Sequence, residues 1–228
     1  MSRATLSFNA MRTHSSSPES LTIDQLTIAG WTGRDKLAVD KHIRELEELG
    51  VARPRSTPTY YRVSASRLTF SDNIEVVGAE SSGEAEFVLL RSADDLFIGV
   101  GSDHTDRKVE AYDVTVSKQM CDKPIAPVLW EFSAVRAHWD ELVLRSWITS
   151  DGERSLYQEG AVAAILSPEA LIAGCERGLP PGSAMFCGTL AARGGVRPAT
   201  RFDFELLDPV LRRSMSHGYS IHALPISG

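Results

Sequence analysis

Short apolar segments alternate with turn-forming residues between positions 60 and 100, and this spacing limits the fold of the chain more than any other feature of its sequence. Asp, Asn, Ser or Gly separates the segments, which are rich in β-branched and aromatic residues, as is typical of consecutive strands. They occupy residues 60–63, 68–70, 74–77, 87–90 and 96–100. The same texture returns at 184–187, 202–206 and 219–224. The sequence therefore predicts a body built mainly from strands.

One segment before this body favours a helix. Thr32 is a candidate N-cap with Asp35 in the first turn, and Gly50 is a stop signal. The face expected to pack against the β-body carries Leu37, Ile43, Leu46 and Leu49. We therefore predict one amphipathic helix over residues 32–49.

Two further helices are expected inside the body. Residues 133–142 are compatible with a helix, and residues 168–175 form another, with Ser167 as its cap and Pro168 at its first position. Strands with a minority of helices place the chain in the α+β class.

The N-terminal part reads as an appendage. The run Ser15-Ser16-Ser17-Pro18 indicates a loosely attached terminus over residues 1–20. Residues 21–58 contain a short strand or hairpin and the helix, which pack on the body at residues 59–228.

Composition narrows the function classes. A formal charge of -6 argues against nucleic acid as a partner, and no run approaches the roughly 18 apolar residues of a membrane span. The start of the chain has no apolar signal core, so we expect a cytoplasmic protein. Cys121, Cys175 and Cys187 are odd in number and widely spaced, which indicates neither a disulfide framework nor a zinc site.

Three carboxylates form the pattern with the clearest chemistry. Glu84 and Glu86 stand at i and i+2, which points both side chains to the same face of a strand. Asp103 follows a glycine-containing apolar strand. Three hard oxygen ligands suit Mg²⁺, with Mn²⁺ or Ca²⁺ as alternatives. The competing interpretation is a solvated strand face and an unrelated turn residue.

The order of these and later residues resembles the fumarylacetoacetate hydrolase superfamily. The resemblance covers residues 81–225 and rests on the E-x-E pair, the D-x-x-x-R motif of Asp103 and Arg107, Lys118 before a proline-containing stretch, and Gly188-Thr189. The strings GSDHTDR and YQEG are similar to a bacterial branch known only as a family of unknown function. The resemblance implies a mixed β-roll or sandwich fold and a homodimer.

The resemblance also implies roles for individual residues. Glu84, Glu86 and Asp103 would be the metal ligands, and Arg107 and Lys118 would assist catalysis. Gln158, Gly188 and Thr189 would contact the substrate.

Three departures from the family pattern bear on these roles. Leu190 stands where the family loop has proline, and Lys123 competes with Lys118 as the assisting lysine. A His-Glu pair upstream is not evident, so His104 becomes the substitute candidate for the acid or base.

The resulting expectation is a metal-dependent hydrolase or lyase that acts on a small oxo-acid, with C–C bond hydrolysis favoured. Cleavage of a C–N bond in a ureido, amide or imide compound is the alternative on the same platform. A third reading is a transcriptional regulator, because residues 32–50 followed by Arg53 and Arg55 resemble a winged helix. Glutamates at 45, 47 and 48 oppose this reading, since they would face phosphates.

Overall fold

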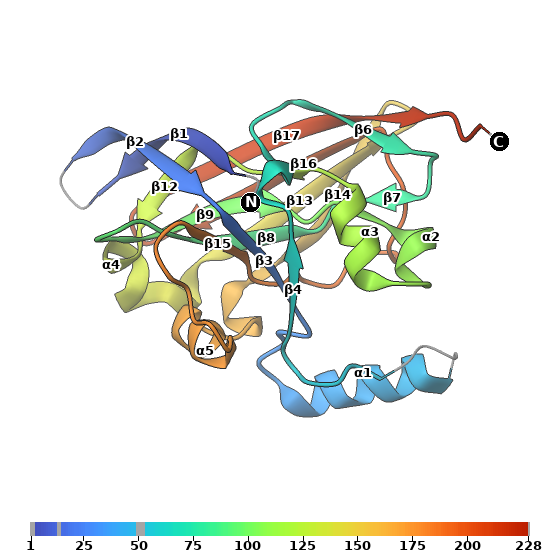
Figure 1. Cartoon of the computed structure of the whole chain (residues 1–228), viewed down its shortest axis with the longest axis horizontal. Coiled ribbons are helices and arrows are strands. Elements are labelled where there is room, and N and C mark those ends of the chain that lie inside the picture. The colour runs from blue at the N-terminus through green and yellow to red at the C-terminus, as the bar shows by residue number, and fades with distance from the viewer. Residues whose placement is uncertain (1–2, 13–14, 49–52, 228) are drawn as a thin grey trace.

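Two β-sheets that share one core form the frame of the molecule (Figure 1). The computed structural model describes residues 3–12, 15–48 and 53–227. The larger sheet has eight strands in the order β2-β1-β12-β9-β8-β15-β3-β4, and the smaller has five in the order β14-β13-β16-β17-β6. Both sheets are mixed, because β1 with β12, β15 with β3 and β17 with β6 run parallel while the other pairs are antiparallel. The predicted α+β class is confirmed.

The strands of the two large sheets are β1 (Ala4–Met11), β2 (Ser16–Ile23), β3 (Gln25–Gly30), β4 (Thr59–Val63), β6 (Asn73–Val77), β8 (Ala85–Arg91), β9 (Leu96–Ser102), β12 (Val128–Glu131), β13 (Val143–Ser150), β14 (Glu153–Ala161), β15 (Ser183–Phe186), β16 (Arg201–Asp208) and β17 (Arg213–Leu224). Two small ladders pair β10 (Thr105–Asp106) with β7 (Ser81–Ser82) and β11 (Lys123–Pro124) with β5 (Leu68–Thr69). The α-helices are α1 (Lys36–Glu48), α2 (Arg107–Glu110), α3 (Val114–Met120), α4 (Phe132–Val135) and α5 (Pro168–Gly174), and the 3-10 turns are η1 (Ala65–Arg67), η2 (Arg136–Glu141) and η3 (Val162–Ala164).

The main core lies between the sheets, because it combines buried side chains of β8 and β9 with those of β13, β16 and β17. Along β16, buried and half-buried residues alternate as the two-residue period of a strand requires. In contrast, nearly every residue of β8 is buried, since this central strand is covered on both faces. The other face of β8 packs in a second hydrophobic cluster together with Phe8, Ile23 and Leu26 from the N-terminal strands.

The N-terminal residues are ordered in a hairpin, so the predicted loose terminus is wrong for the described residues. β1 and β2 pair antiparallel from Ala4↔Ile23 to Met11↔Ser16, and β1 adds in parallel to β12. The alternation of apolar residues in β1, which buries Phe8 and Ala10, was the missed signal. Pro18 fits because β2 is an edge strand. β3 also lies within the large sheet, between β15 and β4, so the expected boundary at residue 58 separates two paired strands.

Helix α1 starts later than predicted and packs differently. Asp35, not Thr32, provides the cap, because its carboxylate accepts hydrogen bonds from the backbone N–H groups of Leu37 and Ala38. Ile43 is buried as expected, whereas Leu37 is 81% exposed, so the predicted apolar face is wrong at this position. Figure 1 shows α1 apart from the sheets, and Leu49 and Gly50 lie outside the described residues.

The helices near the C-terminal half follow the sequence more closely. α5 begins with Pro168, and the Ser167 hydroxyl accepts from the Ala170 N–H, which confirms the predicted cap. Residues 133–142 fold as α4 followed by the 3-10 turn η2 rather than as one α-helix. Among the described residues no helix is long and apolar enough to cross a membrane.

Candidate functional site

The three predicted carboxylates converge because they come from two neighbouring strands. β8 and β9 pair antiparallel with Ala85 opposite Ser102, so Glu84 at the start of β8 lies beside Asp103 at the end of β9. The Asp103 N–H donates to the Glu84 carbonyl at 3.0 Å. One oxygen each of Glu84, Glu86 and Asp103 lies within 4.8 Å of the others, a separation that one ion at about 2.4 Å from each could bridge.

The electrostatics of this cluster favour a cation. Burial raises the pKa of Glu86, and the neighbouring Asp103 and Glu84 carboxylates raise it further. Burial also acts on Asp103, but the charges of Lys118 and Lys123 outweigh it and hold the pKa of Asp103 below its ordinary value. The Asp103 Oδ1 atom is buried without a hydrogen-bond partner. A buried carboxylate oxygen without a hydrogen-bond partner, inside a hard-oxygen donor set, fits a divalent metal ion.

Lys118 is the lysine that faces the carboxylates. Its ammonium, carried by α3, donates to Asp103 Oδ2 and lies 4.0 Å from Glu84 Oε2. Burial lowers the pKa of Lys118, but Asp103 and Glu84 raise it more strongly, so the net direction is upward and the side chain stays charged.

Lys123 has a different place, which separates the two lysines that the sequence left open. Its fully buried ammonium donates to the backbone carbonyls of His104 at 2.7 Å and Cys121 at 2.9 Å, and lies 3.4 Å from Asp103 Oδ1. Lys123 therefore anchors the backbone around the carboxylates and is not among the residues that line the cavity, whereas Lys118 is.

Arg107 also lies at the cluster, as the D-x-x-x-R spacing predicts. Its guanidinium donates to Ser82 Oγ at 2.7 Å and Glu110 Oε2 at 2.8 Å, and lies 3.4 Å from Glu84 Oε1. The single turn of α2, capped by the Asp106 carboxylate, places this arginine beside the start of β8. Arg107 thus adds a third basic side chain beside the carboxylates.

His104 does not reach the cavity. Its ring nitrogens form hydrogen bonds with Tyr219 Oη and Ser81 Oγ, each at 2.8 Å, and the side chain is fully buried. Burial, with smaller contributions from Lys123 and Arg107, lowers the pKa of His104 to about 3, so the ring is neutral. As the neighbour of Asp103 it points to the other side of the chain, and the predicted acid or base role is not supported by its position.

Gln158, Gly188 and Thr189 line the cavity, but their polar atoms are already used. The Gln158 amide oxygen accepts from Ala85 N–H at 3.0 Å and Ser146 Oγ at 2.7 Å, while its nitrogen donates to Thr189 Oγ1 and to the Leu190 carbonyl.

The Gly188-Thr189 loop in turn holds the carboxylate strand. Gly188 N–H donates to Glu86 Oε2 at 2.7 Å, and Thr189 Oγ1 donates to the Ala85 carbonyl at 2.7 Å. Together with Gln158, these residues position Glu86 and the start of β8, a role that spacing alone does not reveal.

A cavity of about 740 Å³ is lined by two groups of residues of different character. The charged group, here called the polar end, consists of Glu84, Glu86, Arg107, Glu110 and Lys118. The apolar group, here called the outer wall, includes Trp31, Val39, Tyr61, Leu190 and Val196. Local periodicity does not reveal this wall, and its clearest sequence signal is an aromatic residue, Trp31, directly after the end of β3 at Gly30.

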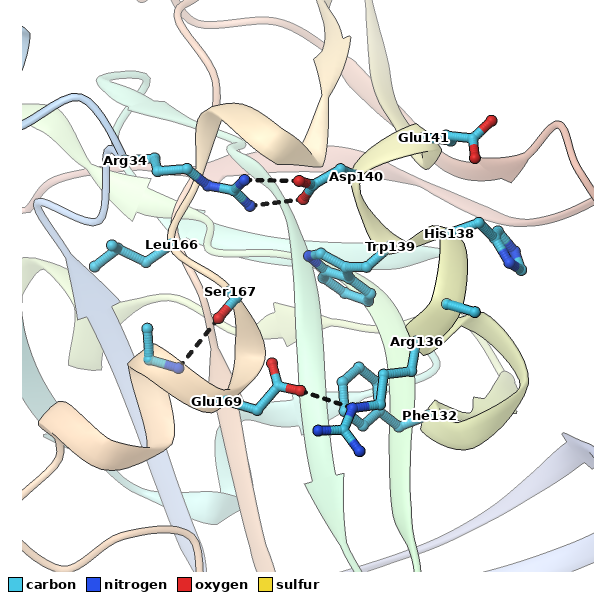
Figure 2. Close-up of a pocket in the computed structure, with 12 residues that line it drawn as sticks. Arg34, Phe132, Arg136, His138, Trp139, Asp140, Glu141, Leu166, Ser167 and Glu169 are labelled. Atoms are coloured by element: carbon cyan, nitrogen blue, oxygen red, sulfur yellow. Dashed lines mark hydrogen bonds and ion pairs between the residues drawn. The ribbon is translucent and has the colours of Figure 1, made fainter.

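Figure 2 shows a second cavity, of about 540 Å³, beside η2 and α5. Arg34 forms two hydrogen bonds with the Asp140 carboxylate at 2.9 and 2.7 Å, and Arg136 donates to Glu169 at 3.0 Å. Each arginine there is thus neutralised by a neighbouring carboxylate, and Glu84 and Glu86 of the converging carboxylates line the other cavity.

Solved structures of several fumarylacetoacetate hydrolase proteins are similar to this chain. A yeast protein of that family has a TM-score of 0.62 and 16% identity, with 90% of this chain and 95% of that chain covered. The fumarylacetoacetate hydrolase of the psychrophilic Exiguobacterium antarcticum has a TM-score of 0.60 and 16% identity over 92% and 82%. A 2-keto-3-deoxy-D-arabinonate dehydratase complexed with magnesium and 2,5-dioxopentanoate has a TM-score of 0.60 and 13% identity over 90% and 74%.

Sequence comparison gives the narrower assignment. No curated protein matches the chain. Residues 29–219 match the model of the family described as "Protein of unknown function (DUF2848)". The expected resemblances, to a family of unknown function and to the fumarylacetoacetate hydrolase fold, are both confirmed. The chain belongs to the DUF2848 family and has the fumarylacetoacetate hydrolase fold.

Proposed function

We propose that the protein is a divalent-metal-dependent hydrolase or lyase that acts on a small 2-oxo acid, with C–C bond hydrolysis as the favoured reaction. The observation that carries the proposal is the cluster of Glu84, Glu86 and Asp103, which Lys118 and Arg107 contact and whose two glutamates line a cavity. The dehydratase with the same fold, complexed with magnesium and 2,5-dioxopentanoate, supports this class of ligand.

Glu84, Glu86 and Asp103 would hold the cation, and Mg²⁺ fits their oxygen atoms best. A divalent cation there would polarise the carboxylate and oxo oxygens of a substrate and stabilise negative charge that develops on them. Gly188 N–H orients Glu86 for this task, and Lys118 orients Asp103.

Lys118 and Arg107 would contribute positive charge to the site rather than bind the metal. Because the pKa of Lys118 is raised, its ammonium acts as a hydrogen-bond donor and positive charge toward a developing oxyanion, not as a base. Arg107, held by Ser82 and Glu110, offers a fixed positive charge to the substrate carboxylate. Both groups are in place before a substrate arrives, so they need little reorganisation.

Metal binding and turnover test the proposal together. Mg²⁺ titration by calorimetry should show one site, and turnover of a panel of 2,4-dioxo acids should require that metal. Asp103→Asn should lose both, whereas Glu75→Gln, an exposed carboxylate on β6, should lose neither. A wild-type protein that does not bind Mg²⁺, Mn²⁺ or Ca²⁺ would rule out the proposed function.

A further inference from the structure

The charge around the polar end indicates what kind of head group the cavity takes. Glu84, Asp103 and Glu110 form ion pairs with Arg107, Lys118 and Lys123, and Glu86 lies beside Glu84 and Asp103 in the carboxylate cluster. With the four carboxylates ionised and the three basic groups protonated, a divalent ion on the cluster would leave one positive charge in excess. This excess matches a monoanion, such as an acid with a single carboxylate.

The rest of the cavity offers a ligand mainly apolar surface. Trp31 and Tyr61 contribute aromatic rings, and Val39, Leu190 and Val196 contribute aliphatic groups. Val196 is 54% exposed. The other four side chains are half-buried, and apolar side chains that line a cavity beside a few polar groups are typical of a ligand site. A ligand that fills the cavity therefore places its non-acidic part against this wall.

Trp31 is held in this wall by the residues on both sides of it. Gly30 pairs with Thr59 at the end of β3, and a side chain on Gly30 would lie 3.1 Å from the ring of Tyr61. On the other side, the Thr32 carbonyl accepts from the Leu166 N–H at 2.8 Å, and Gly33 forms a bridge with Ile165.

The backbone of Trp31 is unusual between these fixed points. Its φ of 58° lies in the left-handed region, which bulky residues seldom adopt. Non-glycine residues in this region concentrate at functional sites, where the surrounding structure imposes the conformation. Trp31 is therefore placed in the wall before a ligand binds, which reduces the entropy lost on binding.

We propose that Trp31 is a specificity-determining residue that selects 2-oxo acids with one carboxylate and an apolar, preferably aromatic, tail. The inference rests on the proposed function, because the metal-bound head group determines which end of the acid faces the wall. Tyr61 connects the outer wall with the polar end, because its ring centroid lies 5.9 Å from Lys118 Nζ and the residue also lines the cavity.

Two monoanionic acids that differ only in their tail test this inference. Pyruvate and phenylpyruvate are titrated by calorimetry into the Mg²⁺-loaded protein, and wild type should bind phenylpyruvate about tenfold more tightly or better. Trp31→Gly should lose most of this preference, and its backbone is not strained, because glycine adopts the left-handed conformation without cost. Trp31→Phe should retain most of it.

The outcomes separate the two proposals. Equal binding of both acids by wild type, or an unchanged preference in Trp31→Gly, overturns the role of Trp31 and leaves the proposed function standing. Failure of both acids to bind the Mg²⁺-loaded wild type overturns the proposed function and the inference with it. Mg²⁺ affinity and the melting temperature of each variant, measured in parallel, must match wild type for Trp31→Gly to support the inference.

Discussion

Gly188 is the residue at which the fold and the candidate site depend on each other most directly. Its φ is +94°, and a Cβ atom there would lie 1.8 Å from Thr32 Oγ1. Its N–H also holds Glu86. We predict that Gly188→Ala destabilises the protein and weakens metal binding together.

The expected loss has two parts. The backbone conformation costs about 1 to 3 kcal/mol with any side chain. Thr32 is buried and its carbonyl is bonded to Leu166, so it cannot move away freely, and this overpacking adds about 1 to 3 kcal/mol. At roughly 2 to 4 °C per kcal/mol for a chain of this size, the melting temperature should fall by about 4 °C at least.

Gly152→Ala is the matched control. Gly152 has a φ of +80°, but a Cβ there would meet no atom within 4 Å, so only the backbone cost applies. Thermal unfolding of both variants, with and without Mg²⁺, measures the difference, and Thr32→Gly in the Gly188→Ala background should restore part of the stability. If Gly188→Ala unfolds no earlier than Gly152→Ala, the close contact with Thr32 does not limit the site.

Three more predictions follow from the described contacts. Because the pKa of His104 in the folded state is about 3, the stability of the protein should be intact above pH 6.5 and should fall by up to about 1.4 kcal/mol per pH unit as the pH drops toward 3. Urea unfolding at several pH values measures this fall. An equal dependence of the unfolding free energy on pH in wild type and His104→Gln would contradict it. Asp103→Ala should lose metal and activity together, whereas Lys118→Ala should keep the metal and lose mainly kcat. Metal analysis and steady-state kinetics of both variants measure this. An Asp103→Ala variant that still binds the metal would show that Asp103 is not a ligand. A chelator should lower the melting temperature, since Mg²⁺ at a hundred times its dissociation constant adds about 2.7 kcal/mol to the stability; equal melting curves with and without Mg²⁺ would refute a built metal site.

The metal cluster was the most predictable part of the molecule. The two-residue period of a strand already places Glu84 and Glu86 on one face, and order along the chain suggests Asp103. Their convergence depends on the pairing of β8 with β9, a contact between strands that the pattern within one strand does not specify. The strands of the body were found for the same reason, because alternation is a local signal.

Other features could not be predicted because they depend on tertiary contacts. Lys118 and Lys123 both precede the proline-containing stretch, and only the backbone carbonyls around Lys123 distinguish its anchoring role. Gln158 was expected to meet substrate, yet its four hydrogen-bond partners come from three distant segments. The exposure of Leu37 depends on how α1 lies relative to the sheets, which the periodicity of the helix sequence does not determine.

The N-terminal hairpin has a consequence for the behaviour of shortened forms of the chain. β1 and β2 precede the residues that match the family model, and β1 covers β12, which would otherwise be the edge of the large sheet. β12 carries the fully buried Leu129 and Trp130. A form that begins at residue 24, and so lacks only the hairpin, would present unpaired backbone and apolar side chains along that strand, a template for aggregation by strand addition. The hairpin therefore protects β12 from self-association, which light scattering with and without residues 1–23 would reveal.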